Sequence, residues 1–106
     1  MTGLTPCVII AGVIKSFADK ETEKLFRRQF SRKIPAQIQR VARRRLEVLD
    51  GAEALSDLRI PPANRLEKLS GDRTRQYRIR INEQWRLCFE WRDGNAYGVE
   101  IVDYHG

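Results

Sequence analysis

The chain has 106 residues, which is enough for one domain with a modest hydrophobic core. No apolar run reaches membrane-spanning length, and the uncharged first fourteen residues lack the basic segment of a signal peptide. Its two cysteines provide neither a metal quartet nor a disulfide framework. We therefore expect a reduced, cytoplasmic protein without a metal or other cofactor, and composition argues against the membrane and disulfide-rich secreted classes.

The positive charge is concentrated in the first half of the chain. The formal net charge is +6 at pH 7. Residues 14–50 carry eleven Lys/Arg and five Asp/Glu, whereas residues 51–106 carry nine of each. Such asymmetry suggests a polyanionic or acidic partner. A solvated helix face that only maintains solubility would have the same composition, so charge alone leaves both interpretations open.

A short strand and a helix are expected at the start of the domain. Residues 14–17 alternate between apolar and polar side chains, which is typical of a strand. Asp19 then offers an N-cap for a helix. The apolar stripe of this helix would consist of Leu25, Phe26 and Phe30.

A second helix is predicted between Pro35, which suits a first helical turn, and Gly51, which is typical of a helix end. One face is apolar and comprises Ile38, Val41, Ala42, Leu46 and Leu49. The other face carries Gln37, Arg40, Arg43 and Arg44. Two helices joined by few residues should pack as an antiparallel hairpin. Residues 52–62 are expected to be irregular, apart from one helical turn.

The second half changes to a period of two, which indicates a meander of strands. Three segments alternate strongly, at residues 76–81, 85–91 and 97–102. Pairing through three-residue loops at 82–84 and 93–95 would gather the apolar side chains on one face, which the helices can cover. This predicted apolar face comprises Tyr77, Ile79, Ile81, Trp85, Leu87, Phe89, Trp91, Tyr97, Val99 and Ile101.

The same register defines a polar face on the other side of the sheet. It places Arg80 opposite Arg86 and Arg78 opposite Cys88. Like charges that face each other destabilise a sheet, so the arginine pair suggests an anion bound between them. The alternatives are that glutamates on the diagonal neutralise the arginines, or that both side chains extend into water.

The end of the last predicted strand adds groups suited to proton transfer. Asp103, Tyr104 and His105 are adjacent, and His105 is the only histidine of the chain. Histidine titrates near neutral pH, arginine binds phosphate bidentately, and a tyrosine ring can stack on a base. With Arg73 and Arg75 nearby, these residues predict metal-independent RNA cleavage by the substrate's own 2′-hydroxyl. On the tripeptide alone, a frayed strand end is the alternative.

One histidine cannot act as both base and acid. Glu67, Asp103 or a tyrosine of lowered pKa would therefore have to share the proton transfer, unless orientation supplies most of the catalysis. Further contacts to RNA are expected from basic side chains of the strands and of the second helix. These are Lys68, Arg75, Arg78, Arg80, Arg40, Arg43 and Arg44.

Several motifs occur in order and at matching separations, at residues 76–82, 84–89, 93–97 and 100–105. With them, the chain resembles the HigB toxins, a branch of the RelE/ParE superfamily. The resemblance implies a single RelE-like α+β domain over 13–106, with a short N-terminal strand and a two-helix hairpin packed on a curved, mainly antiparallel meander. Residues 1–12 would be an N-terminal extension of unclear role.

The resemblance also implies a type II toxin, namely an endoribonuclease that cleaves mRNA in the A site of the ribosome. A HigA-like antitoxin with a helix-turn-helix domain would neutralise it, and operator DNA would be contacted only through that complex. No membrane partner is implied. By motif position, the site residues are Arg73 and Arg86 for the scissile phosphate, Tyr104 for the nucleotide, His105 as acid/base, and Asp103.

The chain departs from the family pattern at one place. Some family members have His-Pro-Leu-Lys-Gly where this chain has residues 67–71, so that Glu67 stands at the histidine position and Ser70 at the lysine position. Either Glu67 serves as the base, with Arg73 or Arg75 replacing the lysine charge, or the protein is a weaker nuclease.

Two other functions are compatible with the sequence. One is non-catalytic inhibition of DNA gyrase, as in the ParE branch, although ParE-like chains generally lack the terminal Asp-Tyr-His pattern. The other is a basic RNA-binding module without catalysis, for which the arginine-rich helix would suffice. Binding of RNA without new ends would distinguish this last function.

Overall fold

The computed structural model describes residues 12–59, 64–69 and 75–103. Within these residues, two helices and a 3₁₀ helix precede a four-stranded sheet with the strand order β1-β2-β3-β4, in which each neighbouring pair is antiparallel. The elements are α1 (Lys20–Phe26), α2 (Ala36–Asp50), η2 (Leu55–Arg59), β1 (Glu67–Lys68), β2 (Gln76–Arg80), β3 (Trp85–Arg92) and β4 (Asn95–Asp103). This α+β architecture confirms the predicted fold class.

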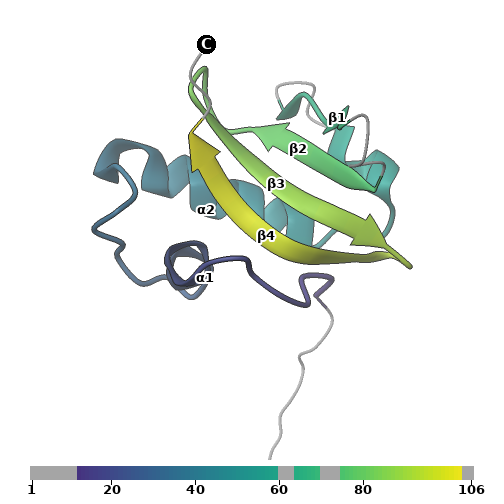
Figure 1. The fold of residues 1–106 in the computed structure, drawn as a ribbon, viewed down its shortest axis with the longest axis horizontal. Helices are drawn as coiled ribbons and strands as arrows, with labels where there is room; N and C mark the ends of the chain where they lie inside the picture. Colours follow the sequence, from purple (N-terminus) through teal and green to yellow (C-terminus); the bar gives the residue numbers. More distant parts are fainter. Residues whose placement is uncertain (1–11, 60–63, 70–74, 104–106) are drawn as a thin grey trace, which may run out of the picture.

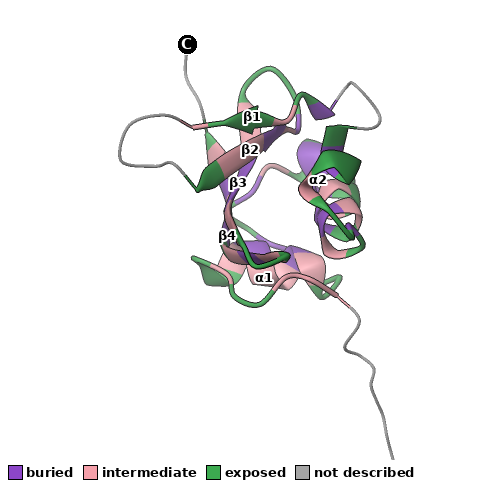
Figure 2. Cartoon of the chain, turned by 90° about the vertical axis from the view of Figure 1, so that its right-hand side faces the viewer, coloured by how far each residue is buried: buried purple, intermediate pink, exposed green. Residues whose placement is uncertain are grey.

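The helices lie on one side of a curved sheet (Figure 1). The view in Figure 2 shows α2 facing the sheet from one side, while no described helix covers the other side. In Figure 1, α2 runs across the view and α1 is seen nearly end on, so the two helices cross rather than lie antiparallel. The result is a two-layer domain with one uncovered sheet face.

The segment before α1 runs beside β4. Ile14 forms a parallel bridge with Ala96, and Phe17 forms one with Val99. These are two isolated bridges and not the regular strand that the alternation at 14–17 predicts. Between them, the Gly98 amide donates a hydrogen bond to the Ser16 hydroxyl at 2.8 Å. The segment still covers this part of the edge of the sheet.

Helix α1 begins where the sequence predicts, because the Asp19 carboxylate accepts a hydrogen bond from the Thr22 amide at 2.7 Å. It ends at Phe26, and the chain then turns through Arg28 in the left-handed region, at φ 65°. Phe30 therefore lies outside the helix and is 67% exposed. Its assignment to an apolar helix stripe was wrong.

Helix α2 has the predicted bounds, between Pro35 and Gly51. Val41, predicted to face the core, is 38% exposed, because it lies about 100° around the helix from the buried Ala42. Gln39 is buried in addition to the predicted core residues. Its amide donates to two carbonyl oxygens of the preceding loop, each at 2.7 Å, which satisfies the polar group inside the protein.

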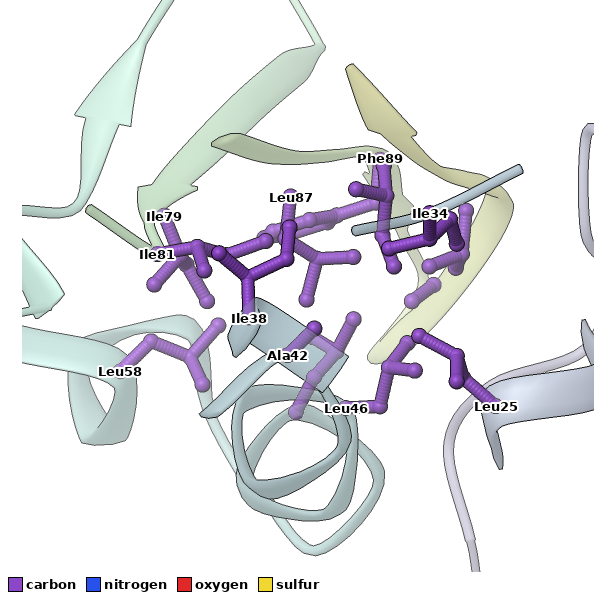
Figure 3. Close-up of a cluster of buried hydrophobic side chains, with 14 of the residues drawn as sticks. Leu25, Ile34, Ile38, Ala42, Leu46, Leu58, Ile79, Ile81, Leu87 and Phe89 are labelled. Carbon is purple, nitrogen blue, oxygen red and sulfur yellow. The ribbon is translucent and has the colours of Figure 1, made fainter. Parts of the chain in front are cut away.

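The hydrophobic core lies between the helices and the inner face of the sheet. Figure 3 shows Leu25 of α1 and Leu46 of α2 directed toward Leu87 of β3, and each of these side chains is fully buried. The remaining buried apolar side chains of this cluster include Ile34, Ile38, Ala42, Leu49, Leu58, Ile79, Ile81, Phe89, Ala96, Val99 and Ile101.

The pairing of β2 with β3 follows the prediction, with Ile79 opposite Leu87. The turn between β3 and β4 is different. It has two residues, Asp93 and Gly94, both at positive φ (53° and 79°), which is typical of a tight hairpin turn. The predicted three-residue loop at 93–95 was therefore wrong, since Asn95 already pairs with Arg92.

A β-bulge restores the predicted register farther along β4. The pairing shifts by one residue between Cys88 and Glu90, and Gly98 in this stretch adopts φ 58°. As a result, Ala96 is buried on the inner face, while Tyr97 lies opposite Glu90 on the polar face. The prediction that Tyr97 belongs to the apolar face was wrong because the pattern gave no sign of this bulge.

We predict that Leu46→Ala lowers the free energy of unfolding by about 2–5 kcal/mol, since it removes a fully buried side chain from the centre of the core. Val41→Ala on the same helix is the matched control and should change it by less than about 0.5 kcal/mol. Chemical denaturation of both variants measures the effect. Equal losses in the two variants would contradict this packing of α2.

A second prediction concerns Glu21, whose carboxylate accepts a hydrogen bond from the Ser31 hydroxyl at 2.6 Å. This bond, with the charge of Lys24 nearby, holds the pKa of Glu21 below its ordinary value of 4.5, although desolvation opposes the effect. A lowered folded-state pKa stabilises the protein above the unfolded-state pKa, and this stability is lost as the pH falls through the folded-state pKa.

Glu21→Gln should therefore be less stable than the wild type near neutral pH, and the difference should shrink as the pH falls below about 4.5. Denaturant unfolding of the two proteins over a series of pH values measures this. A difference that stays constant down to acid pH would show that the charge of Glu21 does not stabilise the fold.

Candidate active site on the open face of the sheet

The sheet face turned away from α2 gathers the charged side chains of the strands. Cross-strand partners share a face, and the buried pair of Ile79 and Leu87 defines the inner one. We call the opposite side the open face. By the observed register it carries Glu67, Gln76, Arg78, Arg80, Arg86, Cys88, Glu90, Arg92, Asn95, Tyr97, Glu100 and Val102.

Two arginines face each other on the open face, as the sequence predicts: Arg80 pairs with Arg86. The Arg86 Nη1 donates to the carbonyl oxygen of Asn82 and, at 3.1 Å, to that of Trp85. These bonds hold its guanidinium at the β2–β3 turn. Within the described part of the chain, neither arginine forms an ion pair with a carboxylate, and Glu90 pairs with a different arginine. Two positive charges thus lie side by side, and no carboxylate of the described residues pairs with them.

Glu67 lies directly opposite Arg78 in the register of β1 and β2. Its carboxylate accepts a hydrogen bond from the Arg78 Nε at 2.5 Å. The proposed base of the site is therefore engaged with a guanidinium on the same face. Cys88, predicted to lie opposite Arg78, does so and is buried.

Asp103 is placed on the other side of the sheet. It pairs with Trp85, and its neighbour Val102 pairs with Arg86, so alternation turns Asp103 away from the open face. Its carboxylate accepts a hydrogen bond from the Gln84 side chain at 3.0 Å. The structure thus does not bring Asp103 together with Arg86.

The other predicted site residues fall into two groups. Arg73, Tyr104 and His105 lie outside the described residues. Lys68 pairs with Tyr77, which packs against the core, so Lys68 does not lie on the open face. Arg75 is exposed just before β2, near the end of the open face where Gln76 pairs with Glu90.

The arginines of α2 form a separate basic surface. Arg40 and Arg44 line a shallow groove with Val41 and Arg45, on the helix layer and not on the open face. Arg43 is engaged structurally, because its Nε donates to the carbonyl oxygen of Leu25 at 3.1 Å. One extended strand of RNA on the open face would not also follow this helix (Figure 2).

Arg45 was not predicted to belong to this surface. Its Nε donates to the carbonyl oxygen of Arg80 at 3.1 Å, which ties α2 to the end of β2. Burial lowers the pKa of Arg45, and the neighbouring charge of Arg44 adds to the effect. The run of three consecutive arginines at 43–45 was visible in the sequence, but only the fold shows which of them reach the groove.

A second feature that sequence reasoning missed is the mixed charge at the other end of the open face. The bulge at Gly98 brings Tyr97 beside Glu90, and the Arg92 guanidinium lies 4.3 Å from the centre of the Tyr97 ring. A small groove opens there, lined also by Glu100. The two ends of the open face thus differ, because Arg80 faces Arg86 at one end, whereas Arg92 forms an ion pair with Glu90 at the other.

The described ranges contain neither a membrane-spanning helix nor a metal-binding cluster. None of the helices there is long and apolar enough to cross a membrane. The same ranges contain no group of three or more His, Cys, Asp or Glu side chains that could hold a metal ion.

Comparison with known proteins agrees with the fold. The model of the family described as "RelE-like toxin of type II toxin-antitoxin system HigB" matches residues 15–105. Toxin HigB-1 of Vibrio cholerae is 47% identical over 86 residues, which cover 80% of this chain and 90% of that protein. Endoribonuclease HigB of Proteus vulgaris is 32% identical over 93 residues, which cover 88% of this chain and 100% of that protein.

An uncharacterized protein of Haemophilus influenzae is 39% identical over 69 residues, which cover 65% of this chain and 68% of that protein. Together, the α+β fold and these matches define a RelE-like toxin domain. The chain belongs to the HigB family of type II toxin–antitoxin systems. Membership of a type II system implies a cognate antitoxin as partner.

Proposed function

We propose that this toxin is an endoribonuclease that cleaves mRNA in the ribosomal A site and so inhibits translation and growth. The observation that carries the proposal is the facing pair of Arg80 and Arg86 on the open face, which has no carboxylate partner among the described residues. Such a pair suits a phosphate anion. A relative that shares 32% identity with this chain is named an endoribonuclease, which supports the same activity.

The chemistry is attack of the substrate's 2′-hydroxyl on the adjacent phosphorus, with departure of the 5′-oxygen. It requires in-line geometry, charge neutralisation at the phosphate and proton transfer, and no metal ion. Arg86 suits the second requirement, because two backbone carbonyls fix its guanidinium before the substrate arrives. We assign phosphate contacts to Arg80 and Arg73 as well, stacking on the nucleotide to Tyr104, and proton transfer to His105.

The basic groove of α2 supports contact with a second polyanion. We assign Arg40 and Arg44 to ribosomal RNA, since a strand held on the open face leaves them accessible on the helix layer. The partners are then the ribosome with its mRNA, and a HigA-like antitoxin whose helix-turn-helix domain contacts operator DNA. The protein would act in the cytoplasm.

The test is cleavage of a defined mRNA on programmed ribosomes, mapped by primer extension. New ends within the A-site codon should appear with ribosomes and be absent with free mRNA. Arg86→Ala should lower the rate by about 10²–10³-fold, because it removes a preorganised positive charge. His105→Ala should lower it by about 10²–10⁴-fold. Arg28→Ala, which removes an exposed arginine that pairs with Glu47 of α2, is the control and should cleave normally.

Other outcomes select other functions. If the wild-type protein produced no new mRNA ends on ribosomes, the nuclease hypothesis would be rejected, and a gyrase inhibition assay would follow. RNA binding without any new ends would indicate a module without catalysis. Cleavage that survives His105→Ala would keep the activity and move proton transfer to another group.

The α2 groove gives an independent prediction. The double variant Arg40→Ala/Arg44→Ala should bind ribosomes more weakly, and its affinity should depend less on salt, because fewer phosphate charges are neutralised. Cosedimentation with ribosomes at several salt concentrations measures both quantities. Arg27→Ala, which removes an exposed arginine at the C-cap of α1, is the control. An unchanged salt dependence in the double variant would remove this groove from the ribosome contact.

A further inference from the structure

The pair formed by Glu67 and Arg78 joins the edge strand β1 to the open face. Both residues belong to strands, they lie opposite each other in the register, and the Arg78 Nε donates to the Glu67 carboxylate at 2.5 Å. The side chains are 51% and 26% exposed, so substrate can reach the pair from the open face. The contact is therefore set by the backbone pairing as well as by charge.

This contact conflicts with a role for Glu67 as general base. Arg78 contacts one carboxylate oxygen of Glu67, Oε1. If Glu67 took a proton from a 2′-hydroxyl, even on its other oxygen, it would lose its negative charge and the charge-assisted hydrogen bond to Arg78 would weaken. A general base also has to be within hydrogen-bond reach of the proton that it abstracts. In this structure Glu67 is instead committed to a guanidinium through Oε1.

The same contact favours a role in orienting Arg78. A guanidinium is planar, so a bond at Nε fixes the plane in which its other N–H groups lie. Arg78 and Arg80 share the open face two residues apart, which is about 7 Å along a strand. Arg86 lies across from Arg80. The three arginines thus form one cluster on the open face, and Glu67 holds Arg78 from the neighbouring strand β1.

We propose that Glu67 is a positioning residue that orients Arg78 toward the RNA phosphate backbone, and that it is not the general base of the reaction. The proposal rests on the proposed nuclease function. The sequence left open whether Glu67 is the general base, and the positioning role takes the place of that one. The proposal also adds Arg78 to the groups that hold the phosphate.

The two roles predict different results for conservative variants. Glu67→Gln keeps an oxygen that can accept from the Arg78 Nε but cannot act as a base. If Glu67 positions Arg78, this variant keeps the rate within about 10-fold of the wild type, whereas a lost general base costs about 10²–10⁴-fold. The cleavage rate of Glu67→Ala should fall to that of Arg78→Ala. The double variant should cleave no more slowly than Arg78→Ala alone, since Glu67 acts through the Arg78 guanidinium.

The experiment measures single-turnover cleavage on programmed ribosomes across a pH series for the wild type and these four variants. The proposal expects Glu67→Gln to keep the shape of the wild-type pH profile. The exposed pair of Glu47 and Arg28, 3.3 Å apart and on the helix side, supplies the matched control Glu47→Gln, which should behave as the wild type. Thermal unfolding of each variant checks that all are folded.

Three results would overturn the proposal. If Glu67→Gln cleaved as slowly as Glu67→Ala and lost the acid limb of the pH profile, Glu67 would be the general base and the nuclease function would stand. A double variant much slower than Arg78→Ala would show that the two residues act separately. A wild type that does not cleave at any pH would overturn the nuclease function itself, and the positioning role with it.

Discussion

Burial of one sheet face under α2 is the constraint on which the rest of this domain depends. Residues opposite each other in an antiparallel sheet share a face, so the packing of Ile79 and Leu87 against the helices also fixes where their neighbours project. Arg78, Arg80 and Arg86 alternate with these core residues and must lie together on the open face. The repulsion between these like charges is therefore opposed by the same hydrophobic contacts that hold the fold together.

The open face is not uniformly basic, and its polarity follows from a local irregularity. A bulge at Gly98, at φ 58°, allows a tight turn at one end of β4 and the predicted register at the other. It turns Tyr97 outward next to Glu90, which forms an ion pair with Arg92 at the end far from the facing arginines. A phosphate backbone would be drawn toward Arg80 and Arg86, because the charge of Arg92 is already balanced by Glu90.

The positions of the carboxylates bear on how the proposed reaction moves its protons. Asp103 lies on the side of Trp85 and binds Gln84, while Glu67 is engaged by Arg78. Neither is directed toward the space between Arg80 and Arg86. In the proposed mechanism, proton transfer is therefore assigned chiefly to His105, near the end of the chain. Phosphate binding and orientation fall on the arginines, whose charges do not change near neutral pH.

The sequence by itself determined the α+β class, the bounds of α2, the Asp19 cap and the facing arginines, because each depends on a local period or on one residue's backbone preference. The tertiary structure alone decided the exposure of Phe30 and Val41, the outward turn of Tyr97, and the contact between Glu67 and Arg78. These depend on where a helix stops, on one extra residue in a strand, and on residues distant in the chain that pairing brings together. A repeating pattern of apolar residues carries no information about such events.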